Sequence, residues 1–186
     1  MSKVTHKNER QCFALLGRQA VGKSSLMLEL ATEYARKGGK VRIYSPHPAQ
    51  FGGFGVLCNR ENIGEILEEL LAGKFKGFVI FDDADTYMGP SSSDGMTAFC
   101  STFRHFDCDI AVSSRAPQQI DIALRRCFTK VCLFKMHEPR AIKCTRELLG
   151  EFEEKQFKVP REKHEYYVYD LEDYTVEFHK TKRMTT

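Results

Sequence analysis

Short apolar segments alternate with amphipathic segments along the first three quarters of the chain. Residues 12–16 (CFALL) are apolar throughout, which predicts a strand buried on both faces. From Ser24 onward, apolar residues recur at helical spacing until Gly38 and Gly39 end the segment. The chain is therefore expected to begin with a strand, a glycine-rich turn and a helix.

The same alternation continues through the middle of the sequence. Further strands are expected at 40–45, 77–82, 109–114 and 130–136. Helices are expected between them, beginning near Asn59, Asp94, Pro117 and Arg140. Strands that alternate with helices predict a mainly parallel central sheet in a three-layer α/β fold.

The last part of the chain has a different pattern. Residues 166–179 (YYVYDLEDYTVEFH) indicate two strands around a turn near Leu171 to Asp173. We therefore expect a C-terminal β-hairpin extension at 164–180, attached to a core at 11–150. The Pro- and Gly-rich segment 46–55 is expected to be a turn or a mobile loop.

Charge is distributed unevenly along the chain. The 186 residues are 42% hydrophobic and 28% charged, which is enough for a sizeable core and a solvated surface. The formal net charge of +3 does not by itself indicate nucleic-acid binding. Residues 61–100 carry two Lys and eight acidic residues, a charge of −6, whereas 102–150 carry nine Lys and Arg and five acidic residues, a charge of +4. The later region is the expected anion-facing surface.

Cysteine usage and hydropathy bear on the cellular location. The seven cysteines form no CxxC pair and are odd in number, and the N-terminus lacks the apolar core of a signal peptide. No apolar run approaches the roughly 20 residues that span a bilayer. We expect a reduced, cytoplasmic protein without an integral membrane segment; for a viral protein, the location is the host cytoplasm or the virion.

The stretch GRQAVGKSS, at 17–25, fits the pattern G-x-x-x-x-G-K-[ST] between the predicted strand and helix. Glycines let successive backbone N–H groups converge on phosphate oxygens, and the helix presents its positive end. We expect Lys23 to reach the β- and γ-phosphates of ATP, and Ser24 to bind Mg²⁺. The predicted nucleotide-binding residues are Gly17, Arg18, Gln19, Ala20, Val21, Gly22, Lys23, Ser24 and Ser25.

Two carboxylates follow the apolar run FVIF. A magnesium ion that bridges two phosphates needs a carboxylate at a rigid strand end, and Asp82 meets that description. Asp83 is aimed differently from Asp82, so we expect it to polarise a water against the γ-phosphate, with Asp85 as the alternative. Many hydrolytic P-loop proteins have Glu at this position, and Asp is one methylene shorter.

Polar and basic residues follow the fourth strand. Ser113 or Ser114 could sense the γ-phosphate, and Ser114 is the predicted catalytic residue of the pair. Phosphoryl transfer also builds negative charge that an arginine can stabilise, often from a neighbouring subunit. Arg125 and Arg126 are the predicted catalytic arginines, and a solvated basic helix end is the alternative explanation of this pair. Further candidates for the arginine are Arg115 and Arg140.

The order of these motifs resembles the hydrolytic branch of P-loop NTPases, specifically the FtsK/HerA-like superfamily of DNA-pumping ATPases. That superfamily includes viral genome-packaging ATPases, and Zot-like phage assembly ATPases are similar. The resemblance covers Cys12 to Met136: GRQAVGKS as Walker A, FVIFDD as Walker B, and DIAVSSRAPQQIDIALRRC as a sensor strand followed by arginines. It implies a sensor strand between the Walker strands, ATP and Mg²⁺ as cofactors, and a ring-shaped homo-oligomer that grips DNA.

Three functions are consistent with these residues. The first is a single P-loop ATPase domain, 1–186, that couples Mg²⁺-dependent ATP hydrolysis to translocation of a nucleic acid. DNA is the expected polymer, and viral genome packaging is an example of such a function. The second is a small nucleoside or nucleotide kinase with an arginine-bearing lid at 115–126. The third is a nucleotide-binding scaffold with little turnover, favoured if Asp83 is too short. Candidate contacts to nucleic-acid phosphates are Arg104, Lys130, Arg140 and Lys143.

Overall fold

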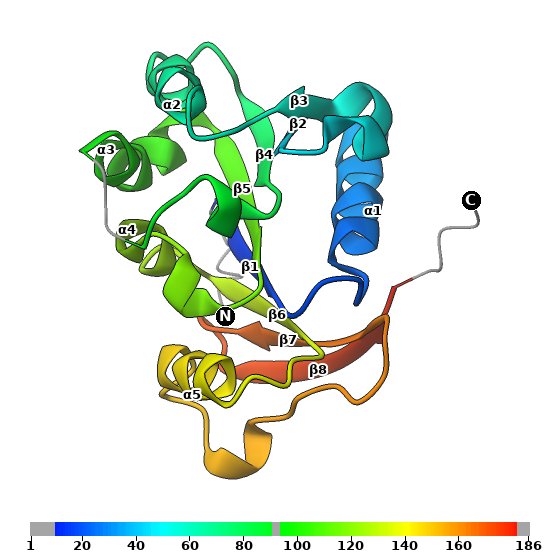
Figure 1. Cartoon of the computed structure of the whole chain (residues 1–186). Helices are drawn as coiled ribbons and strands as arrows, with labels where there is room; N and C mark the ends of the chain where they lie inside the picture. Colours follow the sequence, from blue (N-terminus) through cyan, green and yellow to red (C-terminus); the bar gives the residue numbers. More distant parts are fainter. Residues whose placement is uncertain (1–9, 91–93, 182–186) are drawn as a thin grey trace, which may run out of the picture.

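The computed structural model describes residues 10–90 and 94–181, and over these ranges an eight-stranded sheet runs through the molecule (Figure 1). The strand order is β3-β2-β4-β5-β1-β6-β7-β8. The strands are β1 (Cys12–Leu16), β2 (Val41–Ser45), β3 (Gly55–Leu57), β4 (Gly77–Phe81), β5 (Cys108–Ser114), β6 (Lys130–Phe134), β7 (Glu165–Asp170) and β8 (Thr175–Lys180). The first six are parallel to one another, as the alternation of strands and helices predicts.

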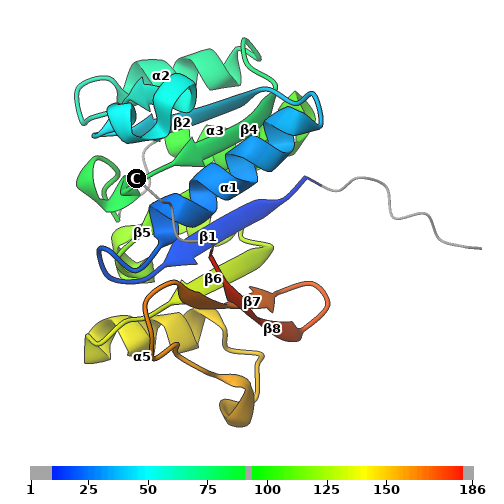
Figure 2. The same cartoon turned by 90° about the vertical axis from the view of Figure 1, so that its right-hand side faces the viewer.

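Helices cover both faces of the sheet, which makes the three-layer α/β architecture (Figures 1 and 2). The α-helices are α1 (Lys23–Arg36), α2 (Ile63–Leu71), α3 (Asp94–Thr102), α4 (Ile122–Arg125) and α5 (Pro139–Leu148). Side chains of β4 alternate between the two cores, because successive strand residues point to opposite faces. Phe78 and Ile80 pack with residues of α1, whereas Val79 and Phe81 pack with residues of α2 and α3. The predicted fold class is confirmed.

The C-terminal hairpin extends the sheet beyond β6. Strand β7 pairs antiparallel with β6, and β8 pairs antiparallel with β7. Phe134 of β6 stacks on Tyr166 of β7 with ring centroids 5.0 Å apart, and Tyr169 is fully buried in the core on the opposite face. The predicted hairpin is thus a continuation of the central sheet.

Two segments differ from the sequence prediction. The end of the expected loop at 46–55 forms the start of the short edge strand β3. Glycine is needed at Gly55, because a Cβ there would overlap the Pro48 carbonyl oxygen. The helix expected from Pro117 is divided into a 3₁₀ turn (Pro117–Gln119) and the four-residue α4. Asp121 separates them, because its carboxylate caps α4 by accepting a hydrogen bond from the Ala123 N–H at 2.8 Å.

None of the helices within residues 10–90 and 94–181 has the length and apolarity needed to cross a lipid bilayer.

Candidate functional site

The glycine-rich stretch forms the loop between β1 and α1. Gly17 and Gly22 have φ angles of 155° and 110°, and Ala20 also has a positive φ of 57°. A Cβ at Gly17 would lie 2.7 Å from Cβ of Phe134 on β6, which is closer than real Cβ atoms approach. Glycine is therefore required at this position for the backbone angle and for the close approach of the neighbouring strand.

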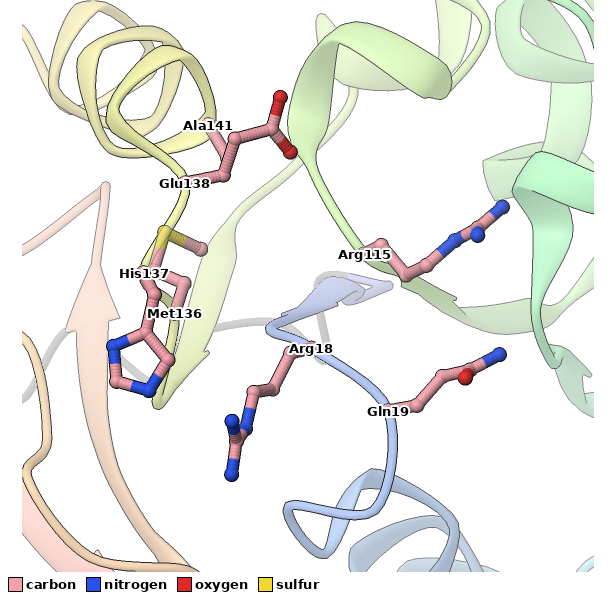
Figure 3. A pocket seen from close by; sticks show the side chains of 7 residues that line it. All are labelled: Arg18, Gln19, Arg115, Met136, His137, Glu138 and Ala141. Atoms are coloured by element: carbon pink, nitrogen blue, oxygen red, sulfur yellow. The ribbon is translucent and has the colours of Figure 1, made fainter.

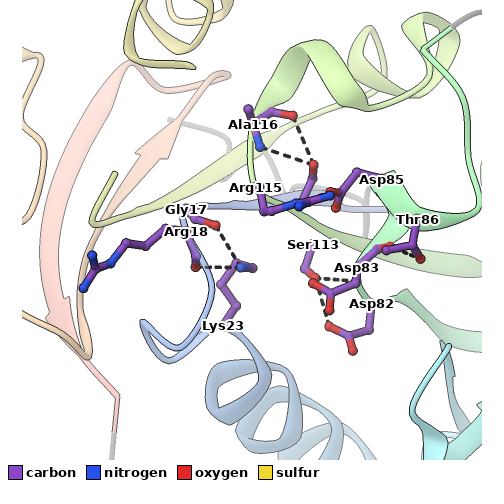
Figure 4. A network of polar contacts seen from close by, with 11 residues as sticks. Gly17, Arg18, Lys23, Asp82, Asp83, Asp85, Thr86, Ser113, Arg115 and Ala116 are labelled. Carbon is purple, nitrogen blue, oxygen red and sulfur yellow. Dashed lines mark hydrogen bonds and ion pairs between the residues drawn. The ribbon is translucent and has the colours of Figure 1, made fainter. Parts of the chain in front are cut away.

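Lys23, the first residue of α1, folds back over this loop (Figure 4). Its ammonium donates hydrogen bonds to the carbonyl oxygens of Gly17, at 2.8 Å, and Arg18, at 2.9 Å. The side chain is buried, and this burial lowers the pKa of Lys23, while the negative charges of Asp83 and Asp82 oppose the shift. The lysine thus sits at the centre of the loop, held against it by two strong bonds.

Asp82 lies in a row of polar residues that crosses three strand ends. The register of β4 with β2 and β5 places Ser45 and Ser113 on either side of it. Its carboxylate accepts hydrogen bonds from the Ser113 hydroxyl at 2.9 Å, the Ser45 hydroxyl at 3.0 Å and the Gln50 amide at 3.2 Å. Burial raises the pKa of Asp82 and the charge of Asp83 adds to the shift, while the two hydroxyls and Lys23 oppose it.

Asp83 turns away from the sheet at the next position. Its backbone is left-handed, with φ 45° and ψ 45°, and its N–H donates to the Ser113 hydroxyl oxygen at 2.9 Å (Figure 4). Left-handed backbone is uncommon for residues other than glycine and is found where the surrounding structure imposes it. Ser113 therefore contacts both aspartates, by donating to the carboxylate of Asp82 and accepting from the main-chain N–H of Asp83.

The two serines at the end of β5 are placed differently. The Ser114 hydroxyl donates to the Ala116 carbonyl at 3.1 Å and accepts from the Ala116 N–H at 3.3 Å, so it caps the following turn. Strand alternation explains the difference: Ser113 shares a face with Ala111, which packs in the core beneath α1. Asp82 and Ser45 are on that same face, so counting positions along the strand could have distinguished the two serines.

A recess of about 360 Å³ opens at the loop. It brings together most of the predicted nucleotide-binding residues and Asp83. Its lining residues are Gln19, Ala20, Gly22, Lys23, Ser24, Ser25, Asp83 and His164. His164, Ser45 and Gln50 were not among the predicted site residues, because each comes to the site from a segment with no nucleotide-binding motif.

A second cavity of about 360 Å³ lies along the loop toward α5 (Figure 3). It is lined by Arg18, Gln19, Arg115, Met136, His137, Glu138 and Ala141. Arg18, at the start of the loop, lines this cavity and is not among the residues that line the recess.

Arg115 is the candidate arginine that the chain itself holds near the loop. Its guanidinium pairs with the Asp85 carboxylate at 2.5 Å, and this ion pair joins the segment after β4 to the segment after β5 (Figure 4). The Asp85 side chain is only 1% exposed, and its second oxygen is buried with no hydrogen-bond partner among the described atoms. Asp85 is therefore engaged with Arg115 in this arrangement.

Arg125 and Arg126 lie at the end of α4 and are not among the residues that line the recess. Arg126 is exposed, whereas the Nε atom of Arg125 is buried without a hydrogen-bond partner among the described atoms. Arg140 and Lys143 are exposed on α5, and Lys130 pairs with Asp170 at 2.8 Å. The side chain of Arg104 lies outside what the structure describes.

The fold and the site together define the class of protein. The glycine-rich loop at 17–25 connects β1 to α1, Asp82 directly follows β4, and β5 lies between β1 and β4. This is the arrangement of a P-loop NTPase fold.

Comparison with known proteins supports the same fold. Neither a protein-family model nor a curated protein sequence matches the chain. Among solved structures, the genome packaging NTPase B204 of Sulfolobus turreted icosahedral virus 2, in complex with AMPPCP, matches with a TM-score of 0.72 at 17% identity, over 95% of this chain and 100% of that one. The N-terminal domain of zonular occludens toxin from Neisseria meningitidis matches with a TM-score of 0.53 at 12% identity, over 94% of this chain and 96% of that one.

A third match extends the comparison to a secretion protein. EccC of Thermomonospora curvata (ATPases 2 and 3), in complex with a signal sequence peptide, matches with a TM-score of 0.66 at 10% identity, over 95% of this chain and 37% of that one. The P-loop NTPase fold that the resemblance implies is thus confirmed, and the fold is what identities this low can show.

Proposed function

We propose that the chain is a Mg²⁺-dependent ATP hydrolase that couples turnover to translocation of a nucleic acid, with DNA as the preferred polymer. The observation that carries the proposal is the meeting of Lys23, Ser24 and Asp83 in one recess beside the buried Asp82. The fold similarity to a protein described as a DNA-packaging ATPase supports the coupling to DNA.

The residues present fit a magnesium–nucleotide complex. Ser24 lines the recess, and Asp82 offers a carboxylate whose orientation is fixed by two serines and Gln50. Among the described residues, no three His, Cys, Asp or Glu side chains gather into a metal site. A cation held by Ser24 and Asp82 would therefore draw further ligands from phosphate oxygens and water, which is the usual preference of Mg²⁺. When bound, it would neutralise charge that develops on the phosphates.

The chain's own residues would divide the remaining work. Loop N–H groups and the ammonium of Lys23 bind the phosphates in this proposal, and the short distance from Lys23 to the loop carbonyls keeps that charge in place. Asp83 orients the attacking water or removes its proton. Ser113 positions the carboxylate of Asp82 and the backbone of Asp83, and Arg125 or Arg126 of an adjacent subunit stabilises the transition state.

The first test is nucleotide binding. We expect the protein to bind ATP and ADP in the presence of Mg²⁺, and Lys23→Ala to weaken binding severely. Lys37→Ala is the matched control, because Lys37 is an exposed lysine at the other end of α1, paired with Glu33. Calorimetry on the three proteins checks this. Absence of nucleotide binding in the unmodified protein, together with no effect of Lys23→Ala, would contradict the proposal at its root.

The second test concerns the use of ATP. We expect DNA to stimulate ATP turnover, with a stimulation that falls steeply as salt is raised, because phosphate contacts release counterions. Turnover is measured with and without DNA and against a panel of nucleosides. ADP release that depends on a nucleoside acceptor would instead identify a kinase. Negligible turnover that rises by orders of magnitude in Asp83→Glu would identify a nucleotide-binding scaffold. The ring assembly and the cytoplasmic or virion location remain predictions.

A further inference from the structure

The turn that leads into the C-terminal hairpin is fastened to the phosphate-binding loop. The N–H of His164 donates a hydrogen bond to the carbonyl of Val21 at 2.8 Å, and the carbonyl of His164 accepts one from the N–H of Thr181 at 2.8 Å. His164 directly precedes β7 and Thr181 directly follows β8. Both ends of the hairpin therefore meet beside the Walker A loop.

The His164 side chain lies over Gly22. A Cβ built at Gly22 would lie 2.9 Å from Nδ1 of the imidazole and 3.1 Å from the Thr181 hydroxyl oxygen, so the glycine makes room for both. Nδ1 is 3.1 Å from that hydroxyl, which fixes the ring and leaves Nε2 to a different partner. His164 also lines the recess together with Ser24 and Ser25.

The backbone of His164 is held in an unfavourable conformation. Its φ is 66°, in the left-handed region that residues other than glycine adopt at a cost. The two main-chain bonds and the Thr181 contact determine this conformation together, which is typical of residues placed for a function.

The order of strands indicates how a nucleotide would be oriented in the recess. Strand β4, with Asp82 and Asp83 at its end, lies on one side of β1, whereas β7 lies on the other side. A nucleotide whose γ-phosphate meets the carboxylates must extend its other end away from β4. That other end carries the nucleoside, and His164 lies on this hairpin side of the recess.

We propose that His164 binds the ribose of the nucleotide, and that the hairpin base forms the nucleoside end of the site. This inference rests on the proposed nucleotide binding. Nε2 supplies the hydrogen bond to the ligand, and Thr181 holds the ring in place through Nδ1. The hairpin is then part of the binding site as well as an extension of the sheet.

The test uses ligands with and without a nucleoside. His164→Gly removes the imidazole, keeps both main-chain hydrogen bonds and suits the left-handed φ. We expect about three- to tenfold weaker binding of ATP and of ADP, the effect of losing one hydrogen bond to the ribose. Binding of inorganic tripolyphosphate, which has no nucleoside, is expected to stay unchanged. Lys23→Ala is expected to weaken all three ligands.

Two further variants distinguish a direct contact of His164 with the nucleotide from a general effect of substitutions in the hairpin. Thr181→Val removes the hydroxyl that orients the ring and is expected to weaken ATP and ADP in the same direction by a smaller factor. His179→Ala is the control from the same hairpin, since His179 lies on β8 and bonds to Glu177, and is expected to bind as the unmodified protein does.

The outcomes distinguish this inference from the proposed function. ATP binding that is normal in both His164→Gly and Thr181→Val overturns the role of His164 and leaves nucleotide binding intact. An equal loss for tripolyphosphate and ATP also overturns it, because the histidine would then act only by shaping the loop. An unmodified protein that binds no nucleotide refutes the proposed function, and the role of His164 with it.

Discussion

At the scale of single residues, the site contains two ionisable side chains that are buried. Asp82 is 1% exposed and Lys23 is 6% exposed. Burial disfavours the charged form of each, so the pKa of Asp82 is raised and that of Lys23 is lowered. Such a site costs stability in the free protein and prepares the groups for a charged ligand.

A first prediction concerns Asp82→Asn. The raised pKa means that the folded state binds a proton more readily than the unfolded chain, so ionised Asp82 opposes folding above its folded pKa. Removing the charge is expected to stabilise the free protein at neutral pH by about 1 kcal/mol, seen as a Tm higher by about 2–4 °C, while ATP turnover is lost. Thermal melting and ATPase assays check both effects.

The pH dependence provides the control for Asp82→Asn. The gain in stability is expected to shrink as pH falls through the folded pKa toward about 4, the ordinary value for Asp, because Asp82 then becomes neutral in both states. A gain that is constant down to that pH would show that the substitution acts through packing.

A second prediction compares the two serines of β5. Ser113→Ala removes the donor to Asp82 and the acceptor for the Asp83 N–H, so we expect turnover to fall about 10- to 100-fold with little change in ATP binding. Ser114→Ala disturbs only the turn at Ala116 and is expected to have a smaller effect. Steady-state kinetics and ATP affinities for both variants check this. A larger loss of turnover in Ser114→Ala would restore the assignment made from the sequence.

At the scale of elements, the loop between β1 and α1 keeps its conformation because β6 packs closely against it. Gly17 donates its N–H to the Ser114 carbonyl at 3.2 Å, and Arg18 donates to the Lys135 carbonyl at 3.2 Å. The loop is thus bonded to the ends of both strands that flank β1. Its shape depends on three parallel strands ending at the same edge of the sheet.

A third prediction follows for Gly17→Ala. The added methyl group would collide with Phe134, so the loop must shift, and we expect ATP affinity to fall at least about tenfold. Gly38→Ala is the matched control: Gly38 also has a positive φ, 86°, but its Cβ would meet nothing within 4 Å. That control is expected to cost about 1–2 kcal/mol of stability and to leave ATP affinity unchanged. Equal ATP affinity in both variants would contradict this account.

The elements themselves were predictable to different degrees. The long strands and α1 follow from apolar runs and helical spacing, since those patterns depend on burial alone. Strand β3 was missed because three residues after a glycine-rich turn are too few to show a periodic pattern of apolar residues. The helix after Pro117 was predicted too long because Asp121 caps a new turn where the spacing suggested continuation.

At the scale of the whole molecule, the predicted arginines are separated from the chain's own nucleotide recess. Arg125 is the last residue of α4 and Arg126 directly follows it, on the face of the sheet opposite α1. The exposed basic residues Arg140 and Lys143 of α5 lie on this same face. In the proposed ring, this face would meet the next subunit and the nucleic acid.

A fourth prediction tests that arrangement by mixing subunits. The variant with both Arg125→Ala and Arg126→Ala is expected to bind ATP but to lose about 10³-fold in turnover, and Lys23→Ala is inactive by itself. Mixing the two is expected to restore part of the activity, because an intact loop then lies beside an intact arginine pair. ATPase assays on mixtures, with light scattering for assembly, check this. A failure of the mixture to recover would contradict action across subunits.

The sequence by itself determined the local part of this protein. A buried strand, a glycine-rich loop and an amphipathic helix in immediate succession define the phosphate-binding element, because each depends on residues close in the chain. The buried strand before Asp82 likewise placed a carboxylate at a strand end. These features gave the fold class and most of the residues that line the recess.

Only the tertiary structure decided which distant residues complete the site. Ser45, Gln50 and Ser113 reach Asp82 because three parallel strands end at one edge in matched register. His164 reaches the loop because the antiparallel hairpin returns the chain to the side of β6. Contacts between segments far apart in the chain depend on strand order and register, which no short motif encodes.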